Sequence, residues 1–124
     1  MYSEKVLEIF YNPENVGVIK GANGVGKIVD QTCGEIIKIY IQVENEKVVD
    51  SKFQAFGSPA IIAATCVAAN MMIGKTLDEC EKNITSAVVL NALGGKLPEN
   101  KQYVCPLAEA VVKSAVKNAR KKAN

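Results

Sequence analysis

The sequence predicts an α+β fold in which a three-stranded antiparallel sheet packs against about five helices. Strand-like runs rich in Ile, Val and Tyr follow one another between residues 27 and 56, and helical patterns lie before and after them. Strands and helices do not alternate, so a parallel sheet with crossover helices is not expected. A chain of 124 residues has the length of one domain, which we expect to span residues 1–124.

The first predicted helix covers residues 3–11, with Ser3 as its N-cap and Asn12-Pro13 as its stop. A glycine-rich connection then leads to three strands that alternate or cluster β-branched and aromatic residues. We expect these strands at residues 27–30, 35–44 and 47–56. The last two are joined by a turn at residues 44–46, which predicts an antiparallel hairpin.

Four further helices are expected after the strands. The first begins at Pro59, with Ser58 as its N-cap, and runs to about Ile73. Its apolar residues surround it almost completely, which indicates a helix buried in the core. Two short helices follow, the first opened by a capping box at Thr76 and the second capped by residue 85 or 86.

The last predicted helix runs from Pro106 to about residue 122, after a loop at residues 97–101. Cys105-Pro106 repeats the arrangement of Ser58-Pro59, in which proline takes the first helical position. Exposed N–H groups and the macrodipole at a helix N-terminus favour a thiolate. We therefore expect the pKa of the Cys105 thiol to lie below that of a free thiol.

Composition excludes several kinds of chemistry. The chain has no histidine, which removes serine–histidine and cysteine–histidine dyads and histidine-containing metal sites. A net charge of +2 is too small to argue for nucleic acid or an anionic membrane as the main ligand. The longest apolar stretch, residues 60–73, is shorter than the about 20 residues of a membrane span. With charges in place of a signal-peptide core at the N-terminus, we expect a cytoplasmic protein with reduced thiols.

A segment at Gly21–Lys27 matches the G-x-x-x-x-G-K pattern of a phosphate-binding loop. The next residue is Ile28, which cannot hold magnesium as the serine or threonine of that motif does. The motif should also open a helix, whereas the residues that follow it here predict a strand. We interpret the segment as a flexible glycine turn.

Four cysteines stand at widely separated positions, with no Cys-x-x-Cys pair. Cys66 lies in the all-apolar helix and is interpreted as a small buried residue. Cys80 has acidic neighbours that disfavour its thiolate, and we expect it at the surface or half-buried. Thiolates suit zinc and iron–sulfur clusters, but spacing alone leaves open whether Cys33 and Cys105 share a site.

Several short segments, in their order and spacing, resemble the iron–sulfur cluster assembly scaffold family that comprises IscU and the N-terminal domain of NifU. The resemblance covers nearly the whole chain and implies the α+β fold of IscU- and SufE-like proteins. The segments that carry it are Tyr2–Val6, Asn12–Gly17, Cys33–Glu35, Lys52–Gly57, Gly74–Glu79 and Leu107–Glu109.

The resemblance implies a protein that builds a [2Fe–2S] cluster and passes it to recipient apo-proteins. A cysteine desulfurase supplies the sulfur in this family, and an Hsp70-type chaperone system assists release. Carried over by position, the family's first cysteine falls on Cys33 and its loop aspartate on Glu35. The core of its chaperone-recognition loop is matched by Leu97, Pro98 and Lys101.

Two ligand positions depart from the family pattern. The second cysteine falls on Ser58, and a serine hydroxyl is a poor ligand for soft metals and cannot carry a persulfide. An ungapped alignment places the family's histidine–cysteine pair on Tyr103-Val104, one residue before Cys105. A compensating insertion and deletion would instead align Cys105 and leave Val104 at the histidine. A four-ligand site would then need Ser58, Cys66, an external thiol or a second subunit.

These observations support two hypotheses. The first is a scaffold that accepts sulfur from a desulfurase and binds a transient [2Fe–2S] cluster, zinc or iron through Cys33, Glu35 and Cys105, with Ser58 as a weak donor. The alternative is a degenerate homologue that binds or regulates the assembly machinery without holding a cluster. A thiol enzyme using Cys105 is disfavoured because no obvious base accompanies it. We expect a monomer or weak dimer and no enzymatic activity.

Overall fold

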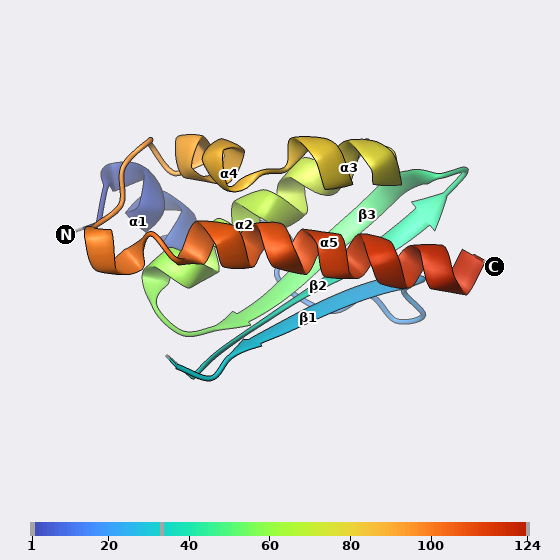
Figure 1. The fold of residues 1–124 in the computed structure, drawn as a ribbon, viewed down its shortest axis with the longest axis horizontal. Coiled ribbons are helices and arrows are strands. Elements are labelled where there is room, and N and C mark those ends of the chain that lie inside the picture. Colours follow the sequence, from blue (N-terminus) through green and yellow to red (C-terminus); the bar gives the residue numbers. More distant parts are fainter. Residues whose placement is uncertain (1, 33, 124) are drawn as a thin grey trace.

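A computed structural model describes residues 2–32 and 34–123. The predicted α+β fold is confirmed: a three-stranded antiparallel sheet of order β1-β2-β3 carries helices on one face (Figure 1). The elements in chain order are α1 (Glu4–Tyr11), β1 (Gly24–Asp30), β2 (Glu35–Glu44), β3 (Lys47–Phe56), α2 (Pro59–Met72), α3 (Leu77–Asn83), α4 (Ser86–Ala92), the 3-10 helix η1 (Glu99–Lys101) and α5 (Val104–Ala123).

The helices form two layers above the sheet. Helix α2 packs over β3 and α5 packs over β1 and β2, while α1, α3 and α4 pack against these two helices (Figure 1). Along β2, alternate side chains face the helices and are buried, beginning with Glu35 and continuing through three isoleucines. Helix α2 is buried almost all round, as its sequence predicts. No helix in the described ranges is both long and apolar enough to cross a membrane.

Local signals in the sequence account for several element ends. The Ser3 hydroxyl accepts a hydrogen bond from the Val6 N–H at 3.2 Å and caps α1. The β2–β3 hairpin has the predicted bounds, and its turn residues Asn45 and Glu46 both have positive φ, at 52° and 64°. Two positive φ values are the signature of a tight type I′ turn, whose twist suits an antiparallel hairpin.

The segment interpreted as a flexible glycine turn is in part a strand, because β1 begins at Gly24 and not at residue 27. Its glycines face α5 at close range. A Cβ on Gly26 would lie 2.4 Å from the Val111 carbonyl oxygen and 2.6 Å from the Ala115 nitrogen, and one on Gly24 would lie 2.9 Å from the Ala119 Cβ. Glycine is therefore needed here for helix–strand packing.

Helix α5 also satisfies the free edge of β1. The Val25 N–H donates to the Asn118 Oδ1 at 2.9 Å, and the Lys27 N–H donates to the Ser114 Oγ at 3.3 Å. Edge strands with unpaired N–H groups can pair with strands of other chains. Here the Asn118 and Ser114 side chains accept hydrogen bonds from two of these N–H groups. Gly24 lies against Ala119 and Gly26 against Ala115, so β1 and α5 run in opposite directions. The N-terminal end of α5 therefore lies where β1 ends (Figure 1).

The other edge of the sheet is covered by two loop segments. The Gly17 N–H donates to the Phe53 carbonyl, and the Phe53 N–H donates to the Asn15 carbonyl, both at 2.9 Å. Near the start of β3, the Val48 N–H donates to the Lys75 carbonyl at 2.9 Å. Backbone groups of β3 that face away from β2 thus find partners within the chain.

The start of the last helix differs from the prediction. Helix α5 begins at Val104, so Cys105 lies inside its first turn and is not the residue before it. Pro106 is tolerated at this position because the first N–H groups of a helix have no partner within the helix. The predicted loop at residues 97–101 also contains η1, which follows Pro98.

We predict that Gly26→Ala lowers the free energy of unfolding by about 1–3 kcal/mol, because the added methyl group meets the backbone of α5. Urea unfolding measures this. Lys27→Ala, at the next position of the same strand and exposed, is the matched control and should stay within about 0.5 kcal/mol of the wild type. Equal stability of both variants would contradict the close helix–strand contact.

Candidate functional site

Three segments that are distant in sequence meet at one end of the sheet: the β1–β2 turn, the β3–α2 loop and the residues before α5 (Figure 1). Glu35, the first residue of β2, lies among them with its side chain on the helix-covered face. Its exposed fraction is 5%, and among residues 2–32 and 34–123 it is the only buried carboxylate. A buried carboxylate is costly unless it is hydrogen-bonded, so its partners define this region.

Both carboxylate oxygens of Glu35 accept hydrogen bonds from different segments. The Ser58 backbone N–H donates to Oε2 at 3.2 Å, and the Tyr103 hydroxyl donates to Oε1 at 2.6 Å. A distance of 2.6 Å falls within the range of about 2.5–2.7 Å for a hydroxyl bonded to an ionised oxygen. Glu35 therefore links the sheet to the starts of α2 and α5.

Gly57 makes room for this arrangement. It has a φ of +150°, and a Cβ there would lie 2.6 Å from the Glu35 Cγ and 2.7 Å from Oε2. Glycine accepts both the backbone conformation and the close approach. The next residue then presents its N–H to the carboxylate, so the β3–α2 loop is shaped around the Glu35 side chain.

The predicted N-cap role of Ser58 is confirmed. Its hydroxyl accepts a hydrogen bond from the Ile61 N–H at 3.5 Å, and Pro59 occupies the first helical position. Its backbone and its side chain thus serve two different ends, because the N–H holds Glu35 while the hydroxyl caps α2.

Cys33 lies outside the described residues. Cys105 is buried, with an exposed fraction of 5%, and burial raises the pKa of its thiol. The predicted lowering of this pKa is therefore wrong. The thiol lies within the first turn of α5 among core side chains, where loss of hydration disfavours the thiolate more than the helix N-terminus favours it.

Tyr103 is the residue whose part in the site the sequence did not reveal. In the ungapped alignment it takes the position of the family's histidine, and its hydroxyl donates to Glu35 from 68 residues away in the chain. A partly buried tyrosine usually finds a hydrogen-bond partner for its hydroxyl, but that rule does not say which one. Among the described residues, no three His, Cys, Asp or Glu side chains gather to hold a metal ion.

The chain matches the family model of the NifU-like N-terminal domain over residues 1–124. It belongs to this family. One relative, the iron–sulfur cluster assembly scaffold protein IscU 1 of Archaeoglobus fulgidus, is 44% identical over 116 residues, which is 94% of this chain and 74% of the relative. The nitrogen fixation protein NifU of Nostoc is 38% identical, and the match covers 96% of this chain but 42% of that protein.

A solved structure has a fold similar to that of this NifU-like domain. It is a protein of Fervidobacterium islandicum AW-1 described as a candidate iron–sulfur cluster assembly scaffold for the SUF system. It aligns with a TM-score of 0.64 and 25% identity, over 97% of this chain and 94% of the other. The resemblance stated from the sequence is confirmed by these matches.

Two other cysteines of the NifU-like domain lie in the core. Cys66 is 1% exposed, as predicted, and its thiol donates to the Glu14 carbonyl at 3.4 Å. It follows Ser58 by eight residues, which is about 12 Å along the axis of α2. Cys80 is fully buried, so its predicted surface or half-buried position is wrong: α3 packs this face onto α5.

The residues expected in the chaperone-recognition loop lie around η1. Leu97 is buried with 7% of its surface exposed, whereas Pro98 and Lys101 are half-buried. The Gln102 side-chain amide donates to the Leu97 carbonyl at 3.4 Å. The leucine of this loop is thus anchored in the core while the following residues lie nearer the surface.

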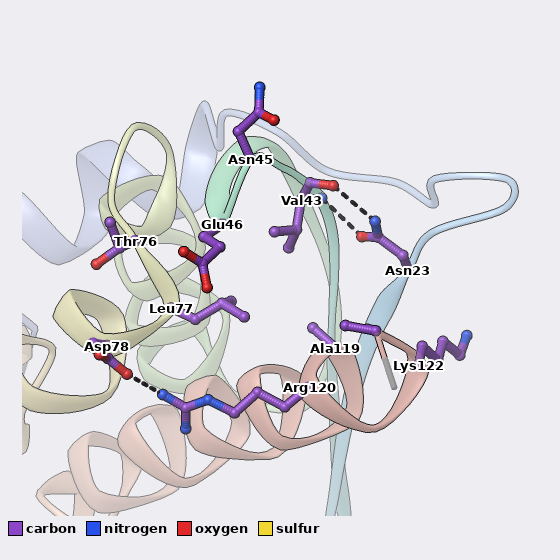
Figure 2. Close-up of a pocket in the computed structure, with 11 residues that line it drawn as sticks. Asn23, Val43, Asn45, Glu46, Thr76, Leu77, Asp78, Ala119, Arg120 and Lys122 are labelled. Carbon is purple, nitrogen blue, oxygen red and sulfur yellow. Dashed lines mark hydrogen bonds and ion pairs between the residues drawn. The ribbon is translucent and has the colours of Figure 1, made fainter.

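A hollow of about 610 Å³ lies at the other end of the sheet, by the last turns of α5 (Figure 2). Arg120 lies along its wall and forms ion pairs with Asp78 and with Glu81, the latter at 3.0 Å. Asn23 closes another side through two hydrogen bonds to the Val43 backbone. These contacts tie α5 to α3 and the sheet, so their polar groups have structural partners.

Tyr103→Phe is expected to lower the free energy of unfolding by about 1–2 kcal/mol, because it removes a hydrogen bond to a buried carboxylate. Tyr40→Phe is the matched control. The Tyr40 hydroxyl donates to the neutral Gln54 side chain at 2.8 Å, and its loss should cost about 0.5–1 kcal/mol. A larger loss for Tyr40→Phe than for Tyr103→Phe would contradict the central place of Glu35.

Burial raises the pKa of the Cys80 thiol from 9.0 to about 11, with Lys75 opposing and Glu79 adding to the shift. The unfolded chain therefore releases this proton at lower pH than the folded protein. Stability should be unaffected by Cys80 below pH 9.0 and should fall as the pH rises from there to about 11. Urea unfolding of Cys80→Ala should show a shallower fall over this interval. Parallel curves for the two proteins would contradict the burial of this thiol.

Proposed function

We propose that this NifU-like domain is an iron–sulfur cluster assembly scaffold. The observation that carries the proposal is the family match over the whole chain, together with a 44% identical relative that is named as such a scaffold. In this role residues 1–124 act as one scaffold domain and not as an enzyme. The cluster, which we take to be [2Fe–2S], is cargo: it is assembled, held for a time and passed to recipient apo-proteins.

We place the cargo site at the end of the sheet where Glu35 lies. Its donors are the thiolates of Cys33 and Cys105 and the oxygen of Glu35, with Ser58 as a weak fourth. Thiolates are the ligands that iron–sulfur clusters and zinc prefer. Burial keeps Cys105 protonated in the free protein, and a bound metal ion would favour loss of that proton.

We assign three kinds of partner to the domain. A cysteine desulfurase supplies sulfur, recipient apo-proteins accept the cluster, and an Hsp70-type chaperone recognises the loop that contains Leu97, Pro98 and Lys101. The buried Leu97 side chain supports a recognition step in which this loop leaves the core. Free thiols require a reducing compartment such as the cytoplasm.

The second candidate function is that of a partner or regulator of the assembly machinery that holds no cluster. Two contacts favour it. The Ser58 hydroxyl caps α2, and the Tyr103 hydroxyl donates to Glu35. Ser58 thus has a structural role at the position of a family cysteine, and in the ungapped alignment Tyr103 has one at the position of the family's histidine. Such a domain would still bind a desulfurase but would take up neither iron nor sulfide.

Anaerobic reconstitution with ferrous iron, cysteine and a cysteine desulfurase separates the two candidates. We expect the wild type to gain visible absorption, iron and acid-labile sulfide, and Cys33→Ala and Cys105→Ala to gain much less. Cys80→Ala is the control, since this thiol belongs to α3 and is fully buried where α3 packs on α5. Wild-type uptake no greater than that of Cys33→Ala would contradict the scaffold function.

Ser58→Cys gives the complementary test. Because a thiolate is a better ligand for iron than a hydroxyl, the variant should retain more sulfide than the wild type. If the wild type holds no cluster while Ser58→Cys does, and both bind the desulfurase, the second candidate function is supported.

A further inference from the structure

We propose that a second copy of this chain docks on residues 14–20, where the two copies pair as antiparallel extended segments centred on Gly17. The inference goes beyond the proposed function and does not depend on it. The observation behind it is a row of unpaired backbone groups at two half-exposed valines, with a carboxylate at one end of the segment and an ammonium group at the other.

The segment covers the edge of β3 but presents an outer edge of its own. The Phe53 N–H donates to the Asn15 carbonyl, and the Gly17 N–H donates to the Phe53 carbonyl, both at 2.9 Å. Val16 lies between these two bonded groups and forms a parallel bridge with Phe53. In such a pairing, the residue between the bonded groups directs its own N–H and C=O away from the neighbouring strand.

Val16 and Val18 offer both backbone groups and side chains to a partner. Within residues 2–32 and 34–123, the N–H and C=O groups of these two residues have no hydrogen-bond partner. Their side chains are 54% and 50% exposed. Unpaired groups along an exposed edge are a template for pairing with another chain, and no proline or charged residue separates the two valines to prevent it.

The order of residues in this segment makes it complementary to itself. A two-fold axis at Gly17 places Val16 of one copy opposite Val18 of the other. If these residues form the hydrogen-bonded pairs of an antiparallel ladder, all four of their N–H and C=O groups in each copy find partners. Gly17 then faces Gly17 of the second copy, so no side chain holds the two backbones apart at the centre.

The charges of the segment select a second copy over another peptide. In the same register Glu14 lies opposite Lys20 of the second copy, and this pair occurs twice in the dimer. Both residues are exposed, and in the described ranges neither side chain forms an ion pair. Opposite charges across an antiparallel pair are stabilising, and a two-fold interface requires a surface that complements itself. A peptide of one charge sign would be attracted at one end and repelled at the other.

The test is sedimentation equilibrium at low ionic strength, because salt screens exposed charges. The interface is small, so we expect a reversible dimer that forms between about 10 µM and 1 mM of chain. Lys20→Glu should weaken the dimer by about tenfold or more, because two opposite-charge pairs become two like-charge pairs. Lys117→Glu makes the same change of net charge at an exposed position of α5, so this control should dimerise as the wild type does.

Two combinations of variants test the register of the pairing. An equimolar mixture of Glu14→Lys and Lys20→Glu should form a heterodimer that is about tenfold or more tighter than the dimer of either variant, since both of its cross-strand pairs again have opposite charges. The double variant that carries both substitutions should regain the wild-type association. Circular dichroism confirms the fold of each variant, and both substituted positions are exposed.

Three outcomes would overturn the inference. They are a wild type that stays monomeric at about 1 mM, equal association of Lys20→Glu and Lys117→Glu, and a mixture that associates no better than its components. None of these measurements uses iron, sulfide or a desulfurase. A failure of this interface is therefore distinguishable from a failure of the scaffold function in the reconstitution experiment.

Discussion

The close approach of α5 to β1 at Gly26 sets the position of α5 on the sheet, and with it the position of Tyr103 relative to Glu35. The helix backbone lies where a side chain would otherwise be, and Asn118 and Ser114 fix it along the strand by accepting β1 N–H groups. Two strand residues rise about 6.7 Å and four helix residues about 6.0 Å, so the pairing of 24 with 119 and 26 with 115 continues along both elements. Extended to Asp30 at the end of β1, the pairing reaches Leu107 in α5, and Tyr103, one helical turn earlier, lies just beyond it beside the start of β2.

Glu35 stands where that pairing ends, and it joins the three segments of the site. Its carboxylate takes one hydrogen bond from the start of α2 and one from Tyr103. The helix N-terminus and the phenol together offset the cost of burying a charge. The described part of the site therefore presents oxygen donors at its centre, and the Cys105 thiol, two residues after Tyr103, is buried with its pKa raised. This balance of donors is the basis of both functional proposals.

Elements whose bounds depend on a few neighbouring residues can be predicted from the sequence. The β2–β3 hairpin follows from its alternating apolar residues and its turn, and the start of α2 follows from Ser58-Pro59. The same argument gives the wrong helix start at Cys105-Pro106, since α5 begins at Val104. Proline is accepted anywhere in the first turn of a helix, not only at its first position. The start of β1 cannot be predicted locally because glycines carry no side-chain pattern, and the role of Gly24 and Gly26 depends on their contacts with α5, far along the chain.

The burial of Cys80 and the contact of Tyr103 with Glu35 cannot be predicted locally either, because both depend on segments far apart in the sequence. The acidic neighbours of Cys80 suggest a surface position, but the packing of α3 on α5 decides its burial. The contact of Tyr103 with Glu35 joins residues 68 positions apart, and neither residue carries a local sign of it. The family resemblance points to both positions, whereas the hydrogen bond between them arises from the packing of the chain.

A double-mutant cycle between Gly26→Ala and Tyr103→Phe tests most directly whether the α5–β1 contact positions the Glu35 site. If the added methyl group displaces α5, the Tyr103–Glu35 hydrogen bond is weakened before the hydroxyl is removed. Tyr103→Phe should then cost at least about 0.5 kcal/mol less in the Gly26→Ala protein than in the wild type, while Tyr40→Phe costs the same in both. Equal costs of Tyr103→Phe in the two backgrounds, within about 0.3 kcal/mol, would contradict the account.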